Sequence, residues 1–476
     1  MHKGSMKTAG LALIGLGMTL AAPAIASAES LTDALTAAYG ANPTLQAARA
    51  KLRAQDEEVP QALSNWRPSV TLSGAVGDSV IRGNYVPNLG EHNLQQTYTA
   101  ALTQPIYRGG QTVDQTAQAK ADVEAGRAQL MNTEQTVLLN VVTAYEDVLQ
   151  DQALVALNRN NEQVMTRDLE ATDDRFKVGE VTRTDVAQSQ SRLSGAHADL
   201  VQAEGNLKSA AANYVALVGH RPGTLSDPAP LTGLPGSADQ ARALAMHDNP
   251  QVVAQGFTAE SAQHAVDLAT DKLKPQVSLN ASETNMMGGP EAYILQPPSS
   301  SFVVANEKSR MSAATLTLTV PIYQQGVEYA DIRQRKNLAG QARTQLDEVR
   351  RDAVDSATRA WENLQAARAR ITSYSAQIKA ADVALEGVRK ENEVGSRTVL
   401  DVLNAEQELL AAKVNLVVAQ HDSVVAEFAL KSAVGQLTAQ SLGLPVEIYD
   451  PIKHYDDVRG KWFGTSASPD DGDGGK

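Results

Sequence analysis

Two kinds of hydrophobic periodicity alternate along the chain, and each kind occurs twice. In short segments such as Ser69 to Val76 and Gln276 to Ala281, apolar and small polar residues alternate, which is the period of a β-strand with one apolar face. In long segments such as Val354 to Val388, apolar residues recur three and four positions apart, which is the period of a helix that packs along one stripe. The pattern predicts strand hairpins followed by long coiled-coil helices.

The same residues recur at constant spacing, so the chain contains two copies of one unit. Asn42-Pro43 recurs 207 positions later as Asn249-Pro250, and Pro105-Ile106-Tyr107 recurs 216 positions later as Pro321-Ile322-Tyr323. The spacing changes once, in the stretch between Leu72 and Leu102 that holds the first hairpin. Such internal repeats decide the architecture before any single residue does.

Prolines and glycines mark the ends of the predicted helices. No proline occurs between Pro105 and Pro222 or between Pro321 and Pro445, and a proline inside a helix costs about 3 kcal/mol. Each gap is broken once, at Gly179 or Gly395, and glycine commonly follows a helix end. The first long helix is therefore expected from Gln111 to Lys177, with a length of about 100 Å, and a shorter helix is expected to run back antiparallel to it.

The first residues have the composition of a secretory signal. Lys3 and Lys7 precede an apolar run from about Leu11 to Ala22, and Ala26-Ser27-Ala28 has the small-residue pattern of a cleavage site. The run is too short to cross a bilayer of about 30 Å, so we expect export and cleavage, with a retained membrane anchor as the alternative.

These signals give a layout for the whole chain. We expect a cleaved signal at 1–28 and a first repeat at 29–220, which holds a helix, a hairpin at about 67–106, a long helix at about 108–178 and a helix at about 182–219. A linker at 221–238 leads to a second repeat at 239–437, which holds a helix, a hairpin at about 274–322, a long helix at about 324–392 and a helix at about 398–437. A C-terminal tail follows at 438–476, and its last part is expected to be disordered.

Composition narrows the class of protein. The chain has no cysteine, so packing and not disulfide bonds must stabilise it. The net charge of −13 argues against a nucleic-acid partner. Only 4% of the residues are aromatic, which suits long helices packed through small side chains.

The number of predicted strands demands more than one chain. If the apolar strand faces meet lipid, every strand edge must be paired, and membrane barrels begin at about eight strands. One chain supplies four strands, so a dimer would give eight and a trimer twelve, and strand number alone leaves both open. Small polar residues on the other face indicate a wet lumen.

The order of elements, together with two motifs, resembles a known family. The motifs are Arg175-Phe176-Lys177-Val178-Gly179 and Glu393-Val394-Gly395-Ser396-Arg397-Thr398-Val399-Leu400-Asp401-Val402-Leu403. With the twice-repeated hairpin, long helix and short helix, they make the chain up to about Gly443 similar to the TolC family of outer-membrane exit ducts, the outer membrane factors.

The resemblance implies a mixed fold of α-helices and membrane β-strands. It implies a homotrimer whose 12-stranded β-barrel lies in the outer-membrane lipid of a Gram-negative bacterium and continues as a coiled-coil α-helical barrel through the periplasm. It also implies a passive duct for efflux, multidrug efflux included, or for type I secretion. A periplasmic adaptor (membrane fusion) protein and an inner-membrane pump of the RND, ABC or MFS type would engage it.

The resemblance further implies a gate at the periplasmic end, near the helix breaks at Gly179 and Gly395. Matched position by position, Thr184 and Asp185 are expected to face Arg397 as a latch between neighbouring coiled coils. Such exposed ion pairs stabilise by about 1 kcal/mol or less each, so a binding partner can open several of them.

The same match implies a lumenal constriction. Asp401 is expected to point into the lumen as one of three symmetry-related carboxylates, which attract cations. Asn392 stands where the family has a latch tyrosine, and Asn404 stands where it has a second lumenal aspartate. We therefore expect a remade latch and one ring of carboxylates in place of two.

A structural interpretation competes with these roles. Thr182 to Asp185 and Thr398 to Asp401 both have the spacing of a capping box, in which the threonine and the acid stabilise a helix start. Capping alone would explain both aspartates, but it would not explain Arg397 at the positive end of a helix dipole.

The sequence holds no motif of an enzyme. It lacks a phosphate-binding loop, a His-Glu-x-x-His pair and a nucleophile elbow, so no catalytic residue, cofactor or metal is expected. His197, His264 and His421 are predicted to be solvated. The alternative function is a soluble periplasmic coiled-coil structural or adaptor protein, although such a protein would not need four alternating strands. The substrate, whether drug, protein, metal or solvent, stays open.

Overall fold

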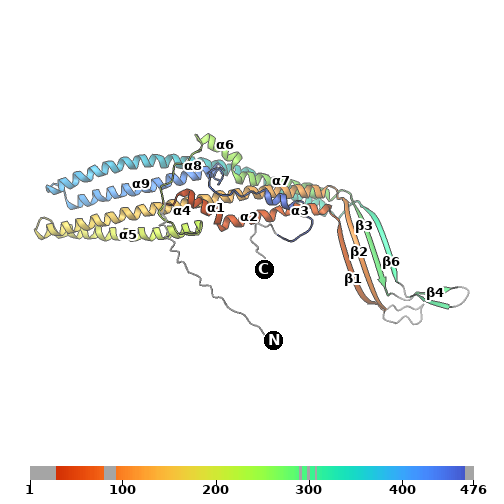
Figure 1. Ribbon diagram of the computed structural model, residues 1–476. Helices are drawn as coiled ribbons and strands as arrows, with labels where there is room; N and C mark the ends of the chain where they lie inside the picture. Colours follow the sequence, from red (N-terminus) through yellow and green to blue (C-terminus); the bar gives the residue numbers. More distant parts are fainter. Residues whose placement is uncertain (1–27, 80–92, 289–291, 297–300, 306–307, 467–476) are drawn as a thin grey trace, which may run out of the picture.

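The molecule is elongated, with a bundle of helices that continues at one end into a curved sheet (Figure 1). The structure is a computed structural model that describes residues 28–79, 93–288, 292–296, 301–305 and 308–466. The predicted signal up to residue 27, the tip of the first hairpin at 80–92 and the predicted disordered end of the tail from 467 on lie outside the described residues.

Four long helices form two coiled coils, one from each repeat. α4 and α8 contain 67 residues each, and α5 and α9 lie antiparallel along them (Figure 1). The bounds of α4 coincide with those expected from the sequence. The described helices are α1 (Leu31–Ala41), α2 (Pro43–Asp56), α3 (Glu58–Leu63), α4 (Gln111–Lys177), α5 (Arg183–Val218), α6 (Ala238–Asp248), α7 (Pro250–Asp271), α8 (Val327–Glu393), α9 (Val399–Ala433) and α10 (Lys453–Val458), with a 3-10 turn at Ser64–Trp66.

Hydropathy sets these helices apart from transmembrane helices. Across the described part of the chain, no helix combines the length and the apolar character that a membrane crossing requires. The long helices instead mix charged and apolar residues along their length, as helices of a coiled coil do.

An asparagine followed by a proline has the same structural role in both repeats. Asn42 caps α2 through its side-chain oxygen and donates from its amide to the carbonyl of Leu217, near the end of α5 (3.0 Å). Asn249 caps α7 and donates to the carbonyl of Ala433, at the end of α9 (3.1 Å). Each asparagine therefore ties the start of its repeat to the end of the same repeat.

The strands of the two repeats join in one sheet. β1 (Ser69–Ser79), β2 (Asn93–Tyr107), β3 (Gln276–Met287) and β6 (Ser309–Thr319) pair antiparallel in the order β1-β2-β3-β6. The pairing of β2 with β3 links the repeats, and β1 and β6 form the two edges of the described sheet.

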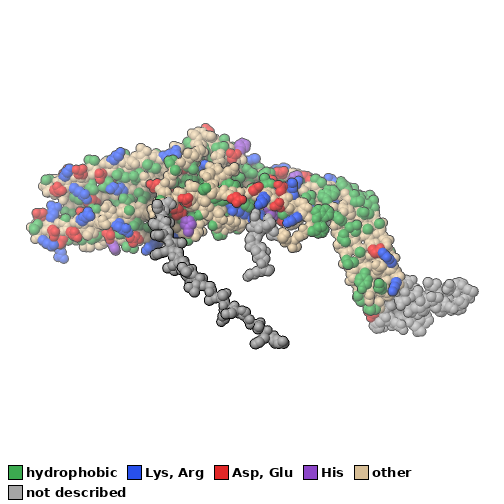
Figure 2. All heavy atoms as spheres, viewed as in Figure 1, with side chains coloured by type: hydrophobic (Ala, Val, Ile, Leu, Met, Phe, Trp, Pro, Cys, Tyr) green, Lys and Arg blue, Asp and Glu red, His purple; other side chains and the backbone are tan. Residues whose placement is uncertain are grey.

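The two faces of the sheet differ in polarity, as the alternation predicted. Val70, Leu72 and Leu316 lie on one face and are 75%, 83% and 67% exposed. Figure 2 shows hydrophobic side chains along the strands, together with polar side chains and a few charged ones, and the register places the ion pair of Glu283 with Arg310 on this same face. On the other face, the hydroxyls of Thr99 and Thr284 lie 3.3 Å apart. A single chain thus exposes a large apolar surface, which marks an interaction site.

The hairpin region differs in two details from the sequence prediction. Where a loop was predicted after β3, β4 (Ala292–Gln296) and β5 (Ser301–Ala305) form a separate two-stranded sheet. Pro105 lies inside β2 at a shift of register, whereas its repeat partner Pro321 lies beyond the end of β6. A proline lacks the N–H that a strand ladder uses, so it is tolerated at a bulge or outside the strand.

The main core lies halfway along the helices, where the linker crosses α4. The Tyr145 hydroxyl lies 2.8 Å from the carbonyl of Glu29 and 2.7 Å from that of Ser226 in the linker. Tyr145 and Tyr214 are fully buried, with ring centres 6.4 Å apart. The linker between the repeats therefore passes the middle of the long helix.

The C-terminal tail is better packed than its polar composition predicted. Ala439 and Leu444 are buried in the main core, and Val458 of α10 is 2% exposed. His454 Nδ1 lies 3.0 Å from the buried carboxylate of Asp56 on α2. A few apolar residues suffice here because they enter grooves that the long helices already provide.

Candidate functional site

Each coiled coil ends in a short turn, at the end of the molecule farthest from the sheet (Figure 1). Gly179 has φ 82° and Gly395 has φ 81°, in the left-handed region that favours glycine. A Cβ added at either glycine would meet no atom within 4 Å. Backbone conformation, and not lack of space, therefore requires glycine here. We call the turns Val178–Thr182 and Val394–Thr398 the tip.

The helices that follow the tip both begin with a capping box. Thr182 donates to the Asp185 carboxylate from its backbone N and from Oγ1, at 2.8 Å each, and Asp185 N donates back at 3.3 Å. Thr398 and Asp401 repeat the arrangement. Hydrogen bonds from Thr398 lower the pKa of Asp401, which keeps this carboxylate ionised at neutral pH. The capping interpretation is confirmed for both aspartates.

Arg397 pairs with a carboxylate of its own repeat. Arg397 Nε lies 2.9 Å from Glu391 Oε2, and the Arg397 carbonyl accepts a hydrogen bond from Asn392 Nδ2 (2.8 Å). Thr184 is exposed in the first turn of α5, and Asp185 is engaged in capping. All five residues are described, and within the described chain Arg397 pairs with Glu391 and not with Asp185.

Two arginine-asparagine hydrogen bonds join the coiled coils just behind the tip. Arg175 Nη1 at the end of α4 donates to Asn392 Oδ1 at the end of α8 (3.1 Å). Arg192 Nη2 of α5 donates to Asn404 Oδ1 of α9 (3.0 Å). The sequence indicated both asparagines, but it did not indicate either arginine as their partner, because the two repeats are far apart along the chain.

A buried acid lies deeper between the coiled coils. Glu406 of α9 has a side chain that is 4% exposed, and it pairs with Arg389 of α8. Burial raises the pKa of Glu406 to about 7, helped by Asp168 of α4 and opposed by Arg389. Sequence reasoning missed this residue. The sequence feature that could have indicated it is an acidic residue in the apolar stripe of the helix, three positions from both Leu403 and Leu409.

A further polar contact joins the coiled coils near mid-length. His421 of α9 lies with Nε2 3.0 Å from Asp147 of α4 and with Nδ1 3.2 Å from Asp422. Burial lowers the pKa of His421, but the two carboxylates outweigh burial and the pKa is raised. The prediction that His421 is solvated was wrong, because helical periodicity does not reveal a partner on another helix.

One group of side chains in the described part of the chain has the composition of a metal site. Asp114 of α4 faces His264 and Asp267 of α7, and their ligand atoms lie within 4.8 Å of one another. Burial is the largest cause of the raised pKa of Asp114, and Asp271 adds to it. Exposed and half-buried acidic groups of this kind are common without an ion, so the group is assigned no functional role.

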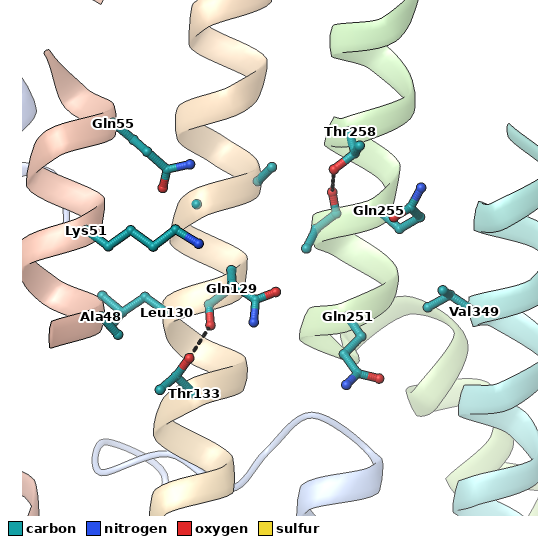
Figure 3. A pocket seen from close by; sticks show the side chains of 13 residues that line it. Ala48, Lys51, Gln55, Gln129, Leu130, Thr133, Gln251, Gln255, Thr258 and Val349 are labelled. Carbon is teal, nitrogen blue, oxygen red and sulfur yellow. Dashed lines mark hydrogen bonds between the residues drawn. The ribbon is translucent and has the colours of Figure 1, made fainter. Parts of the chain in front are cut away.

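A groove separates α2 and α4 from α7 and α8 (Figure 3). Gln55, Gln129 and Gln255 project into it, and Lys51 is the only charged side chain among the residues that line it. Amide and hydroxyl side chains alternate in this lining with small and apolar ones such as Ala48 and Leu130, so the groove has the mixed character of a seam between helix pairs.

Comparison with known proteins gives one consistent result. A family model described as outer membrane efflux protein matches residues 34–220 and 242–436. The outer membrane efflux protein BepC of Brucella suis biovar 1 is 37% identical, with 94% of this chain and 93% of that protein covered. The outer membrane protein TolC of Escherichia coli is 26% identical, with 90% and 87% covered. The structure of the Campylobacter jejuni CmeC outer membrane channel is similar with a TM-score of 0.75 at 15% identity, covering 90% of this chain and 89% of that one.

Proposed function

The chain belongs to the outer membrane efflux protein family, and from this premise we propose that three copies form a passive exit duct across the outer membrane, opened at the tip by protein partners. The duct role and the outer-membrane location follow from the family. The trimer, the gate and the partners are the proposal.

Edge pairing supports the assembly. Among the residues that the structure describes, no strand pairs with the outer side of β1 or β6, and an open edge cannot lie in lipid, because its N–H and C=O groups would lack partners. Three copies of the four-stranded sheet give the 12-stranded barrel, with the apolar face outward and the threonine-rich face toward the lumen. The soluble coiled-coil alternative would leave the apolar face in water.

The contacts behind the tip support a gate. Arg175 to Asn392 and Arg192 to Asn404 each join the two coiled coils near the tip through a single hydrogen bond between exposed or half-buried groups. Such contacts are individually weak, so a partner's binding energy can separate them. A contact of Thr184 or Asp185 with Arg397 of a neighbouring chain would add to this latch, and Asp401 would line the constriction.

The exposed apolar residues of the tip support a protein partner. Val178 is 72% exposed and Val394 is 80% exposed, at equivalent places in the two repeats. Apolar side chains presented on rigid turns suit docking by the helical end of a periplasmic adaptor, which an inner-membrane pump would in turn engage. We propose that energy enters through these partners and that the duct itself catalyses no reaction.

The observation that carries the proposed gate is the pair of hydrogen bonds between the two coiled coils. Ion conductance of the purified protein in planar bilayers tests it. We expect low conductance from the parent and a several-fold increase in Arg175→Ala. Arg159→Ala is the matched control, because Arg159 of α4 pairs with Glu204 of α5 (3.0 Å) inside one coiled coil, and its loss should leave conductance low. Equal conductance in all three proteins would contradict a gate at this place.

A further inference from the structure

The described part of the C-terminal tail carries two exposed aromatic side chains beyond α10. Trp462 is 59% exposed and Phe463 is 89% exposed, the largest exposed fraction among the large hydrophobic side chains of the described residues. Neither residue belongs to the proposed gate or to the barrel strands. Adjacent large apolar side chains that are exposed in a single chain mark a surface that lipid or another molecule covers.

The chain holds this aromatic pair at the base of the sheet. Arg67, two residues before β1 begins, donates from Nη1 to the carbonyl of Lys461 (2.7 Å). The Arg67 guanidinium lies 4.8 Å from the centre of the Trp462 ring, the geometry of a cation-π contact. The preceding residue, Trp66, accepts a hydrogen bond at its carbonyl from Gln104 of β2 (2.9 Å).

The segment before the pair is fixed as well. Val458 is buried, and the Arg127 guanidinium of α4 lies 5.1 Å from the Tyr455 ring centre. Lys461 N donates to the carbonyl of Val458 (2.9 Å). Packing of α10 on one side and Arg67 on the other therefore fix Lys461 and Trp462, while more than half of Trp462 and nearly all of Phe463 stay exposed.

The apolar face of the sheet begins at the same end of the strands as the aromatic pair. Val70 at the start of β1 is 75% exposed, and Leu318 near the end of β6 is 63% exposed. Tyr107 and Tyr323, at the same end of the strands, are 45% and 73% exposed. Figure 2 shows hydrophobic side chains gathered where the strands adjoin the helices. Aromatic rings prefer such a boundary between hydrocarbon and water.

We propose that Trp462 and Phe463 insert into the headgroup region of the phospholipid leaflet around the barrel base, so that the C-terminal segment is a peripheral membrane anchor. The proposal rests on the proposed function, since it requires the apolar face of the sheet to lie in lipid. Arg67 and the exposed Lys461 stand beside the rings, where phosphate groups of phospholipids can meet them while the alkyl chains lie along the rings.

Tryptophan quenching by brominated lipid tests the anchor directly. The chain has three tryptophans, so W66F/W361F leaves Trp462 as the only tryptophan, and excitation at the red edge of the absorption band selects it over the tyrosines. In vesicles of phosphatidylcholine brominated near the headgroup end of the acyl chains, we expect Trp462 to lose roughly half of its emission, because a ring at the interface lies beside the bromine. W66F/W462F is the matched control, since Trp361 lies on α8 in the helical bundle, and its emission should not change.

A third protein separates failure of the anchor from failure of the barrel. Leu72→Trp in the W66F/W361F/W462F background places the fluorophore on the lipid face of β1, and it should be quenched if the sheet lies in lipid. Quenching at position 72 without quenching of Trp462 would overturn the anchor and leave the duct intact. No quenching at either position would overturn the membrane barrel itself.

A change beside the fluorophore tests whether both rings take part. Phe463→Ser in the Trp462-only protein removes one ring that makes no buried contact, so folding should be unaffected and quenching of Trp462 should fall. Ile448→Ser, at a 42% exposed position earlier in the same segment, should leave quenching unchanged. Equal quenching in the parent and in Phe463→Ser would show that Phe463 does not insert.

Discussion

At the scale of the residue, matched positions in the two repeats separate structural roles from functional ones. Asp185 and Asp401 make the same capping hydrogen bonds to Thr182 and Thr398. Any effect of capping on the helix start must therefore be common to both aspartates. Any effect that only one of them shows must come from its place in the assembled duct.

Replacing each aspartate by asparagine uses this symmetry. Asparagine can still accept the capping hydrogen bond, but it carries no charge. We expect Asp401→Asn to lower the preference for cations, measured as a shift of the reversal potential in a salt gradient, because a ring of three carboxylates is lost. Asp185→Asn should leave the reversal potential where it is in the parent. Equal shifts in the two variants would rule out a special lumenal position for Asp401.

The raised pKa of Glu406 predicts a response of the gate to pH. The pKa is about 7 in the folded chain against an ordinary 4.5, so burial favours the neutral acid. The neutral form of Glu406 therefore stabilises the packed coiled coils. This stabilisation is complete below about pH 4.5 and is lost as the pH rises through about 7. Asp168 and Arg389 are the charged groups that face it. We expect parent conductance to rise between about pH 6 and 8, and Glu406→Gln to show no such rise.

Glu146 provides the control for that experiment. Burial raises its pKa to about 7 as well, but Glu146 lies near the middle of α4, far along the helix from the tip. Glu146→Gln should therefore keep the rise of conductance with pH that the parent shows. If Glu146→Gln abolishes that rise and Glu406→Gln does not, the pH response does not come from the region behind the tip.

At the scale of the element, glycines in α5 and at the tip predict opposite effects of one substitution. Gly179 has a left-handed backbone, which costs other residues about 1–2 kcal/mol. Gly195 lies inside the helix α5, where alanine is favoured over glycine by about 1 kcal/mol. Neither position has an atom within 4 Å of an added Cβ, so packing does not obscure the comparison.

We therefore expect Gly179→Ala to lower the thermal midpoint of the coiled coil and Gly195→Ala to raise it. Circular dichroism of the helical signal against temperature, in detergent, measures both. The sign of the difference is the decisive quantity, because the two proteins gain the same methyl group. A higher midpoint for Gly179→Ala would mean that the turn does not hold a left-handed residue.

At the scale of the whole molecule, the absence of cysteine gives a clean test of assembly. Edge strands β1 and β6 should meet between neighbouring chains, so Thr71→Cys combined with Thr317→Cys places one thiol on each edge. With a flexible bis-maleimide we expect bands of two and three linked chains and none larger, measured by denaturing electrophoresis. Either single-cysteine variant should give no band of three. A ladder that stops at two chains would favour a barrel of eight strands.

The sequence determined the elements because their signals are local. Glycine and proline placed the ends of the long helices, and α4 has the bounds that this rule predicts. Alternation placed the apolar face of the strands, and the repeat of Asn42-Pro43 as Asn249-Pro250 marked the same capping device twice. A hydrogen bond within four residues, such as the Thr182 to Asp185 cap, needs no tertiary information.

Only the tertiary structure decided which residues of different helices meet. Asn392 and Asn404 stood out in the sequence, but their partners Arg175 and Arg192 lie more than 200 positions away along the chain. Glu406 is another case, because burial by other helices and not its neighbours in sequence raises its pKa. The composition of the tail likewise concealed its packing, since its few apolar residues fill grooves formed elsewhere. Periodicity shows which face of a helix is buried, whereas the partner on the facing helix depends on how the helices are arranged in space.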